Sequence, residues 1–217
     1  MSPCFSQDLM IPCGSGQLEA RLAYLDDCPG DTGVILCPPH PLLAGNMENN
    51  VILAMAATLV QHFPVLSFNY RSVGKSFRPD PDLPLFEYWT GLDNEGSFGE
   101  VISDTRELLK RSSRYFRKYH LIGYSFGSFV GLSALSDSAL SFTAVTPPLA
   151  EHDFRALAGI SCSTCLLFAG NDSLLDREGV ELPSGAVVHE VPGSDHFFLG
   201  SEKTVAEYVE SFLLSIR

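Results

Sequence analysis

The chain has 217 residues, of which 45% are hydrophobic and 18% are charged, values typical of one folded domain and unlike those of a disordered chain. Its net charge of -12 disfavours nucleic acid and anionic membranes as partners, because phosphate groups repel an acidic surface. The N-terminus lacks the basic residues and apolar core of a secretory signal, and no apolar run is long enough to cross a membrane. We therefore expect a cytoplasmic protein.

Strand-like and helix-like patterns alternate along the chain, which predicts a single α/β domain with a mostly parallel, twisted sheet and helices on both faces. The predicted strands span residues 18–24 at an exposed edge, 33–37, 65–69, 120–124, 142–145, 164–169 and 187–191. The predicted helices span residues 47–61, capped by Asn46, and 126–135; a third follows the capping-box pattern of Ser97 and Glu100, and a fourth begins at Ser201.

Six cysteines are present, and we expect them to be reduced in the cytoplasm. Two of them, Cys162 and Cys165, have CxxC spacing, but no second closely spaced pair of ligands accompanies them, as a zinc site would require. They also open a predicted strand, whereas a redox motif places its thiols at a helix start. The sequence therefore predicts structural cysteines, with neither a metal nor another cofactor. The remaining four are Cys4, Cys13, Cys28 and Cys37.

Residues 123–127 have the sequence GYSFG and match the GxSxG pattern. Alone, this short pattern is weak evidence. Its context is more specific, because HLIGY before Ser125 predicts a strand and FGSFVGLSAL after it predicts a helix, the arrangement of a nucleophile elbow. Glycines at 123 and 127 relieve crowding in such a turn. We therefore predict Ser125 as a nucleophile at a helix N-terminus, where free N–H groups favour an oxyanion; an idle serine in a glycine-rich turn is the alternative.

A serine nucleophile needs a general base, and in this fold the chain order is serine, acid, histidine. Asp172 follows a predicted strand, and we prefer it to Asp176 because it lies closer to the carboxyl edge of the sheet. His196 lies between the last strand and the last helix, whereas His189 falls inside the strand pattern and is expected to pack. Asp195 is adjacent to His196 and cannot easily reach its imidazole. We predict His196 as the base and Asp172 as the group that orients it.

The oxyanion of acyl transfer needs two backbone N–H donors. Phe126, directly after the serine, is predicted to supply one. The other is expected from the loop that follows the strand at 33–37 and has the sequence PPHPL. Because proline has no N–H, His40 and Leu42 remain, and we favour Leu42.

Residues 76–95 interrupt the alternation of elements with several prolines and the single tryptophan, Trp89. A long, irregular stretch inside a compact domain is usually functional or disordered, and its aromatic residues favour an ordered flap. We predict a flap over about residues 76–96 that covers a shallow site, with Trp89 and His40 in contact with substrate. The short stretch between Ser125 and Asp172 leaves no room for a cap domain.

Five segments in serial order resemble the short α/β-hydrolases marked by an HPHP loop: PPHPLLAGNMENN, FNYRSVGKS, GYSFG, FAGND and GSDHFF. The resemblance covers most of the chain and implies an α/β-hydrolase fold with Ser125, Asp172 and His196 as the catalytic residues. Members of this group are mostly hydrolases without an assigned substrate. The chain departs from the pattern at Pro38, where a histidine is usual, and at Ser72, where glycine is usual, and both departures bear on the shape of the pocket.

These features predict a serine hydrolase that cleaves a small ester or thioester through an acyl-enzyme. The expected partner is a small-molecule acyl substrate, with no nucleic acid and no membrane. Two alternatives remain open. One is a peptidase or amidase on the same three residues, which an acidic pocket for the substrate N-terminus would distinguish. The other is a non-catalytic hydrolase-fold protein that binds a partner, against which the complete Ser, Asp and His set argues.

Overall fold

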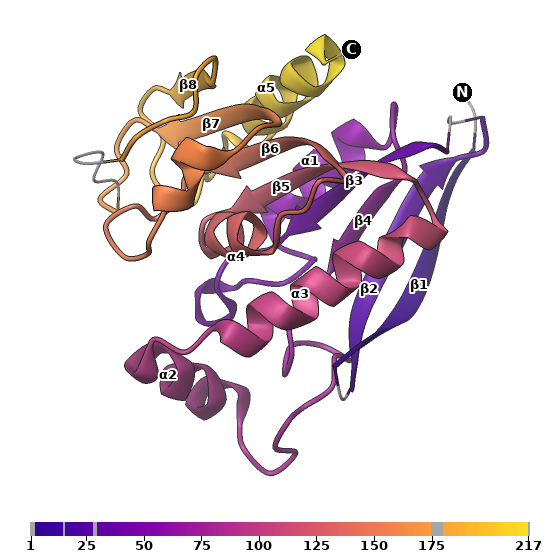
Figure 1. The fold of residues 1–217 in the computed structure, drawn as a ribbon, viewed down its shortest axis with the longest axis vertical. Coiled ribbons are helices and arrows are strands. Elements are labelled where there is room, and N and C mark those ends of the chain that lie inside the picture. Colours follow the sequence, from indigo (N-terminus) through magenta and orange to yellow (C-terminus); the bar gives the residue numbers. More distant parts are fainter. Residues whose placement is uncertain (1–2, 15, 28–29, 175–179, 217) are drawn as a thin grey trace.

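The structure, a computed structural model, describes residues 3–14, 16–27, 30–174 and 180–216. Over these residues the strands form one sheet in the order β1-β2-β4-β3-β5-β6-β7-β8 (Figure 1). Neighbouring strands from β4 to β8 are parallel, and β2 is antiparallel to both β1 and β4. The predicted α/β fold is therefore confirmed. The strands are β1 (Cys4–Cys13), β2 (Gly16–Leu25), β3 (Thr32–Cys37), β4 (Val65–Phe68), β5 (Lys118–Tyr124), β6 (Ala139–Val145), β7 (Ser163–Ala169) and β8 (Val187–Val191).

Helices cover both faces of the sheet. On one face α1 (Asn50–Leu59) packs against α5 (Glu202–Ser215), and on the other α3 (Gly99–Arg111) packs against α4 (Phe126–Ala134) (Figure 1). Strand β3 contributes to both cores: Val34 and Leu36 lie in the core with α1 and α5, whereas Ile35 and Cys37 lie in the core with α3 and α4. A strand buried on both faces needs a continuous apolar run, as GVILC provides.

The sequence analysis predicted that β2 would lie at the edge of the sheet. This prediction is wrong. Strand β1 pairs with β2 over ten residues in antiparallel register and takes the edge position. Most of β1 is exposed, and in its sequence, CFSQDLMIPC, the polar residues form the single run SQD and do not alternate with apolar ones, so its apolar periodicity is weak. Polar residues and proline are typical of an edge strand, because its outer side has no neighbour to bond.

Helix α1 starts later than predicted. Asn49, not Asn46, is its cap, and the Asn49 side chain accepts the N–H groups of Val51 and Ile52 at 3.0 and 3.5 Å. Asn46 instead accepts the N–H of Glu48 at 2.7 Å and closes a turn before the helix. The side chain of either asparagine can accept a backbone N–H at the start of a helix, so the sequence pattern does not show which of the two is the cap.

Helix α3 begins at Gly99 without a side-chain cap, so the predicted capping box is wrong. Ser97 belongs to the end of the preceding helix, where its N–H donates to the carbonyl of Leu92. Gly96 before it has φ +58°, the left-handed conformation that ends many helices. Ser201 does precede α5, as predicted, although its side chain makes no cap hydrogen bond.

The predicted flap contains a helix, α2 (Leu85–Glu95), which follows the prolines at 79, 81 and 84. Trp89 on this helix is fully buried, and Tyr88 and Leu92 pack partly against the same core. Positions 85, 88, 89 and 92 follow the helical period, and they form the inner face of α2. The prediction of an irregular segment is therefore wrong for residues 85–95, whereas residues 76–84, which include the three prolines, form neither helix nor strand.

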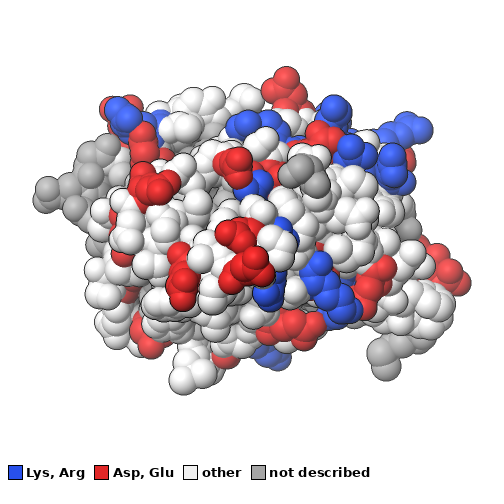
Figure 2. Space-filling view, turned by 90° about the horizontal axis from the view of Figure 1, so that it is seen from below, with Lys and Arg blue, Asp and Glu red and all other residues white. Residues whose placement is uncertain are grey.

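Residues 126–172 form α4, β6, η3 (Arg155–Gly159) and β7, with no further domain inserted among them. Within the described part of the chain, no helix is long and apolar enough to cross a membrane. On the face shown in Figure 2, acidic side chains are dispersed among uncharged ones, and basic side chains gather mainly towards one side. The acidic excess is thus not concentrated in a single patch on this face.

Candidate active site

Ser125 occupies the sharp turn between β5 and α4. Its backbone angles are φ 52° and ψ -124°, a conformation that L-residues rarely adopt. A Cβ atom on Gly123 would lie 2.3 Å from the Gly127 carbonyl oxygen, and one on Gly127 would lie 2.2 Å from the Cys37 carbonyl oxygen. The turn therefore requires glycine at both flanking positions, and it lifts the serine above the carboxyl end of β5.

Ser125, His196 and Asp172 are hydrogen-bonded in series. Ser125 Oγ lies 2.7 Å from His196 Nε2, and His196 Nδ1 lies 2.8 Å from Asp172 Oδ2. The side chains of His196 and Asp172 are 6% and 1% exposed. The structure thus brings together the three residues predicted from the sequence, in a site where little water competes for their hydrogen bonds.

Asp172 is oriented by the turn that follows β7. The N–H of Leu174 donates to Asp172 Oδ1 at 2.9 Å, which leaves Oδ2 to face the imidazole. The rival acid Asp176 lies outside the described residues. Asp195 accepts the N–H of Phe197 at 3.0 Å in its own exposed turn, so Asp172 is the carboxylate paired with the ring.

Tyr124 is a contributor that the sequence analysis missed. Its hydroxyl donates to the His196 carbonyl oxygen at 3.0 Å, and its ring stacks on the imidazole at 6.3 Å between centroids. Burial raises the pKa of this hydroxyl well above its usual value, so it remains a donor. The signal was weak, because Tyr124 is simply the variable residue before the serine in the GYSFG motif.

The loop after β3 lies against the turn that carries Ser125. A Cβ atom on Gly127 would clash with the carbonyl oxygens of Cys37 and Pro38. The backbone of this loop and the backbone of the Ser125 turn are therefore in direct contact, with no side chain between them. Phe126, predicted as one oxyanion donor, begins α4, where a backbone N–H has no partner within the helix. The Leu42 N–H, predicted as the other, donates to Nδ1 of His40 at 3.3 Å.

Comparisons with known proteins agree with this architecture. No protein-family model matches the sequence. Over 220 residues the chain is 24% identical to RP471 of Rickettsia prowazekii. The aligned region covers 93% of this chain and 86% of that protein. An alpha-beta serine hydrolase homologue from Coxiella burnetii superposes with a TM-score of 0.76 at 23% identity, covering 95% of this chain and 97% of that one. XC6422 from Xanthomonas campestris, a serine hydrolase without a lid, superposes with a TM-score of 0.77 at 20% identity, covering 96% and 94%.

The chain has the α/β-hydrolase fold. The likeness to XC6422 also agrees with the absence of an inserted domain between residues 126 and 172.

In this α/β-hydrolase fold a cavity of about 610 Å³ opens beside Ser125. Aromatic rings form much of its wall: Phe98, Phe126, Phe129 and His152, the last stacked on Phe129 at 4.5 Å. Its lining also includes Leu42, Leu43, Leu174 and the carboxylates of Asp93, Glu151 and Asp153. Within the described residues, no group of His, Cys, Asp and Glu side chains is arranged to hold a metal ion.

The two predicted substrate contacts lie differently in this α/β-hydrolase fold. His40 lines the cavity, and its ring meets the edge of Phe126 at 4.9 Å. Trp89 is fully buried behind His40, with the two rings 5.1 Å apart, and it donates to the Arg71 carbonyl oxygen at 3.3 Å. Trp89 therefore supports the wall of the cavity and does not line it.

Burial lowers the pKa of both imidazoles in the cavity wall. For His40 the loss of solvent outweighs the nearby Asp93 carboxylate, whose Oδ1 lies 3.0 Å from Nε2. For His152 burial again lowers the pKa, and it outweighs the nearby Glu151 carboxylate, which raises the pKa. Both rings are therefore neutral at pH 7, and the formal charge on the cavity wall comes from its carboxylates.

Proposed function

We propose that this protein is a serine hydrolase that cleaves small carboxylic esters or thioesters through an acyl-enzyme on Ser125. The observation that carries the proposal is the unbroken series of hydrogen bonds from Ser125 Oγ through His196 to Asp172. The turn that holds the serine above the end of β5 and the cavity beside it provide the setting.

In the first half of the reaction, Ser125 Oγ attacks the acyl carbon while His196 Nε2 takes the hydroxyl proton. The carbonyl π electrons move to oxygen and form the tetrahedral intermediate. When the intermediate collapses, His196 returns its proton to the departing alcohol or thiol. Asp172 holds the proton on Nδ1, so that Nε2 is free to accept, and it stabilises the imidazolium that forms.

In the second half, water replaces the alcohol. His196 Nε2 takes a proton from water as the water oxygen attacks the acyl carbon, and the proton then returns to Ser125 Oγ as the acid leaves. The burial of His196 and Asp172 keeps the charged pair away from bulk water, where competing hydrogen bonds would weaken it.

The oxyanion would be held by the N–H of Phe126 and one N–H of the loop after β3. The sequence analysis considered His40 and Leu42 for this second donor and favoured Leu42. Since the Leu42 N–H already donates to His40 Nδ1, whereas no acceptor for the His40 N–H is found among the described residues, we favour His40 as the second donor. Losing such a donor typically costs about 100- to 1,000-fold in rate.

A fluorophosphonate probe tests the proposal directly. We expect it to label the wild-type protein at Ser125 and to leave Ser125→Ala unlabelled, and we expect p-nitrophenyl acetate to be cleaved by the wild type alone. A folded wild type that neither reacts with the probe nor cleaves the ester would contradict the proposal and would favour a non-catalytic binding protein.

The carboxylates at the cavity favour a second candidate, a peptidase or amidase that takes substrates with a free ammonium group. Asp93 and Glu151 line the cavity, and its described lining includes neither Lys nor Arg. Asp153 is neutralised by Arg155. Asp93 Oδ1 lies 3.0 Å from Nε2 of the neutral His40, so Asp93 and Glu151 keep two negative charges at the cavity. An ammonium group would be attracted to them, whereas an acyl group that carries a carboxylate would be repelled.

Matched p-nitrophenyl esters separate the two candidates. One acyl chain ends in trimethylammonium, one in its neutral tert-butyl isostere and one in a carboxylate. An acidic subsite would favour the cationic ester over the neutral one by up to about fivefold in kcat/KM, the range of an exposed charge pair, and Glu151→Gln would reduce that preference. Equal rates for cationic and neutral esters, with no cleavage of aminoacyl p-nitroanilides, would exclude the second candidate.

A further inference from the structure

Two consecutive residues after β4 hold the two ends of the loop that follows β3. We propose that Asn69 and Tyr70 are positioning residues for the oxyanion site: they fix residues 38–47 so that the His40 N–H stays beside Ser125. The inference rests on the proposed serine hydrolase function, and it assigns a role to the segment FNYRSVGKS, which contributes no residue to the Ser–His–Asp series.

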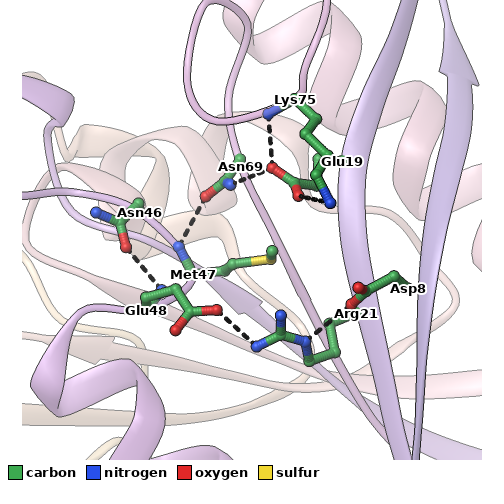
Figure 3. Close-up of polar contacts among 8 residues, drawn as sticks. All are labelled: Asp8, Glu19, Arg21, Asn46, Met47, Glu48, Asn69 and Lys75. Carbon is green, nitrogen blue, oxygen red and sulfur yellow. Dashed lines mark hydrogen bonds and ion pairs between the residues drawn. The ribbon is translucent and has the colours of Figure 1, made fainter.

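Asn69 binds the far end of this loop through a buried polar network (Figure 3). Its Oδ1 accepts the N–H of Met47 at 2.8 Å, and its Nδ2 donates to Glu19 Oε2 at 2.9 Å. Glu19 Oε2 also accepts the N–H of Lys75 at 2.7 Å. Asn69 is 4% and Glu19 is 7% exposed, so the amide cannot turn without leaving buried polar atoms unpaired.

The backbone of Asn69 is fixed as firmly as its side chain. Its N–H donates to the Glu19 carbonyl oxygen at 2.8 Å, and its own carbonyl oxygen accepts the Ser76 hydroxyl at 2.9 Å. The Glu19 N–H in turn donates to Ser76 Oγ at 2.9 Å. The network therefore transmits the rigid position of β2 in the sheet to Met47 in the loop.

Tyr70 binds the near end of the loop. Its hydroxyl donates to the Pro38 carbonyl oxygen at 3.1 Å, and the residue is 1% exposed. Burial keeps the pKa of the hydroxyl well above its usual value, so it stays a donor. The Tyr70 ring also meets Phe126, the residue of the first oxyanion donor, at 5.8 Å. One side chain thus contacts both halves of the proposed oxyanion site.

Between these two ends the loop is tightly folded around His40. The His40 carbonyl oxygen accepts the N–H groups of Leu43 and Gly45 at 2.8 and 3.1 Å. A Cβ on Gly45 would lie 2.0 Å from the Pro39 carbonyl oxygen, so the two backbone segments are in direct contact. Because the turn is closed in this way, a shift at either Pro38 or Met47 moves the His40 peptide as well.

A second tether provides a matched control. Glu48, next to Met47, accepts from Arg21 at 2.7 Å, and Arg21 also contacts Asp8 (Figure 3). These side chains are 56%, 32% and 59% exposed. Exposed ion pairs contribute little to holding a structure. We therefore expect the buried network, and not this surface one, to set the position of the loop.

The test compares Tyr70→Phe, Asn69→Ala and Glu48→Gln with wild type. Active sites are counted with the fluorophosphonate probe, and kcat and KM are measured per labelled site with p-nitrophenyl acetate. The affinity of a trifluoromethyl ketone is measured in parallel, since its adduct with Ser125 places an oxyanion in the same position as the reaction does.

For Tyr70→Phe and Asn69→Ala we expect kcat per site to fall about 5- to 20-fold, less than the loss of a donor itself. We expect ketone affinity to fall by a similar factor, with KM unchanged. Glu48→Gln should match wild type. A purely structural role would lower the number of labelled sites and leave kcat and ketone affinity per site unchanged.

The outcomes distinguish this inference from the proposed function. Wild-type values per site in Tyr70→Phe, which keeps the shape of the residue, would overturn the positioning role even if Asn69→Ala fails to fold. So would an equal loss in Glu48→Gln. In both cases an active wild type leaves the hydrolase proposal standing, whereas a wild type that neither reacts with the probe nor cleaves the ester would refute both.

Discussion

At the scale of single residues, Asp172 uses both of its carboxylate oxygens. Oδ2 accepts from His196 Nδ1 and Oδ1 accepts from the Leu174 N–H. Asparagine has the same shape but one acceptor, and its amide hydrogens would hold the imidazole in the wrong tautomer. We therefore expect Asp172→Asn to lower kcat for p-nitrophenyl acetate by about 1,000- to 10,000-fold.

Asp195→Asn is the control for that substitution. Asp195 accepts one N–H, from Phe197, in an exposed turn next to His196, and asparagine can accept the same bond. We expect this variant to retain wild-type kcat. Equal losses of kcat in the two variants would mean that kcat depends on negative charge near His196 and not on the hydrogen bond between Asp172 and the His196 imidazole.

The three residues of the hydrogen-bonded series were predictable because local patterns mark each of them. The glycines around Ser125 signal the turn, and Asp172 and His196 each follow a strand-like run. The contact of Tyr124 with His196 was not predictable, because it depends on how close the end of β5 lies to the loop after β8. The preference for Leu42 over His40 failed to consider the His40 side chain, which accepts the Leu42 N–H within its own turn.

At the scale of elements, the β5–α4 turn depends on the absence of side chains at its base. In Gly127→Ala the new Cβ would meet the Cys37 carbonyl oxygen at 2.2 Å, and neither backbone can yield without moving β3 or α4. We expect a loss of about 3 kcal/mol in the free energy of unfolding, the upper end for an overpacked core. Urea denaturation followed by circular dichroism measures it.

Gly131 lies on the same helix and gives the matched comparison. A Cβ there would have its nearest neighbours at 3.5 Å, an ordinary contact distance. Alanine also favours helix over glycine by up to about 1 kcal/mol. Gly131→Ala should therefore unfold at the same or a higher urea concentration than wild type, and a loss as large as that of Gly127→Ala would refute the steric explanation.

Elements with strong apolar periodicity were predictable, and those without it were not. The central strands are buried on both faces and have continuous apolar runs, so their position in the chain was evident. Strand β1 is mostly exposed, does not alternate polar with apolar residues, and is held by its pairing with β2, a neighbour in the sheet whose pairing the sequence pattern does not reveal. Helix α2 was missed because the prolines before it obscured the helical spacing of Tyr88, Trp89 and Leu92.

At the scale of the whole molecule, the sheet brings together residues that are far apart in the chain. The loops after β3, β5, β7 and β8 all leave the carboxyl ends of parallel strands, and they supply His40, Ser125, Asp172 and His196. Topology places these loops along the same edge of the sheet, with β6 between β5 and β7. The sequence predicted which residues lie at that edge, whereas the cavity wall, with Phe129 stacked on His152, depends on packing between elements.

Protonation of a buried histidine links the stability of the whole domain to pH. His120 in β5 is 3% exposed, with Nδ1 2.8 Å from Ser141 Oγ and its ring against Phe63. Burial lowers its pKa from 6.5 to about 4. Between these two values the unfolded chain binds a proton that the folded one does not, so the free energy of unfolding falls as the pH is lowered.

We expect this one residue to remove up to about 3 kcal/mol of stability between pH 6.5 and pH 4. His120→Gln keeps a polar partner for Ser141 but has no group that titrates in this range. Urea denaturation at pH 7 and pH 5 should therefore show a smaller loss in the variant than in wild type. The same loss in both proteins would show that other groups, and not His120, govern acid unfolding.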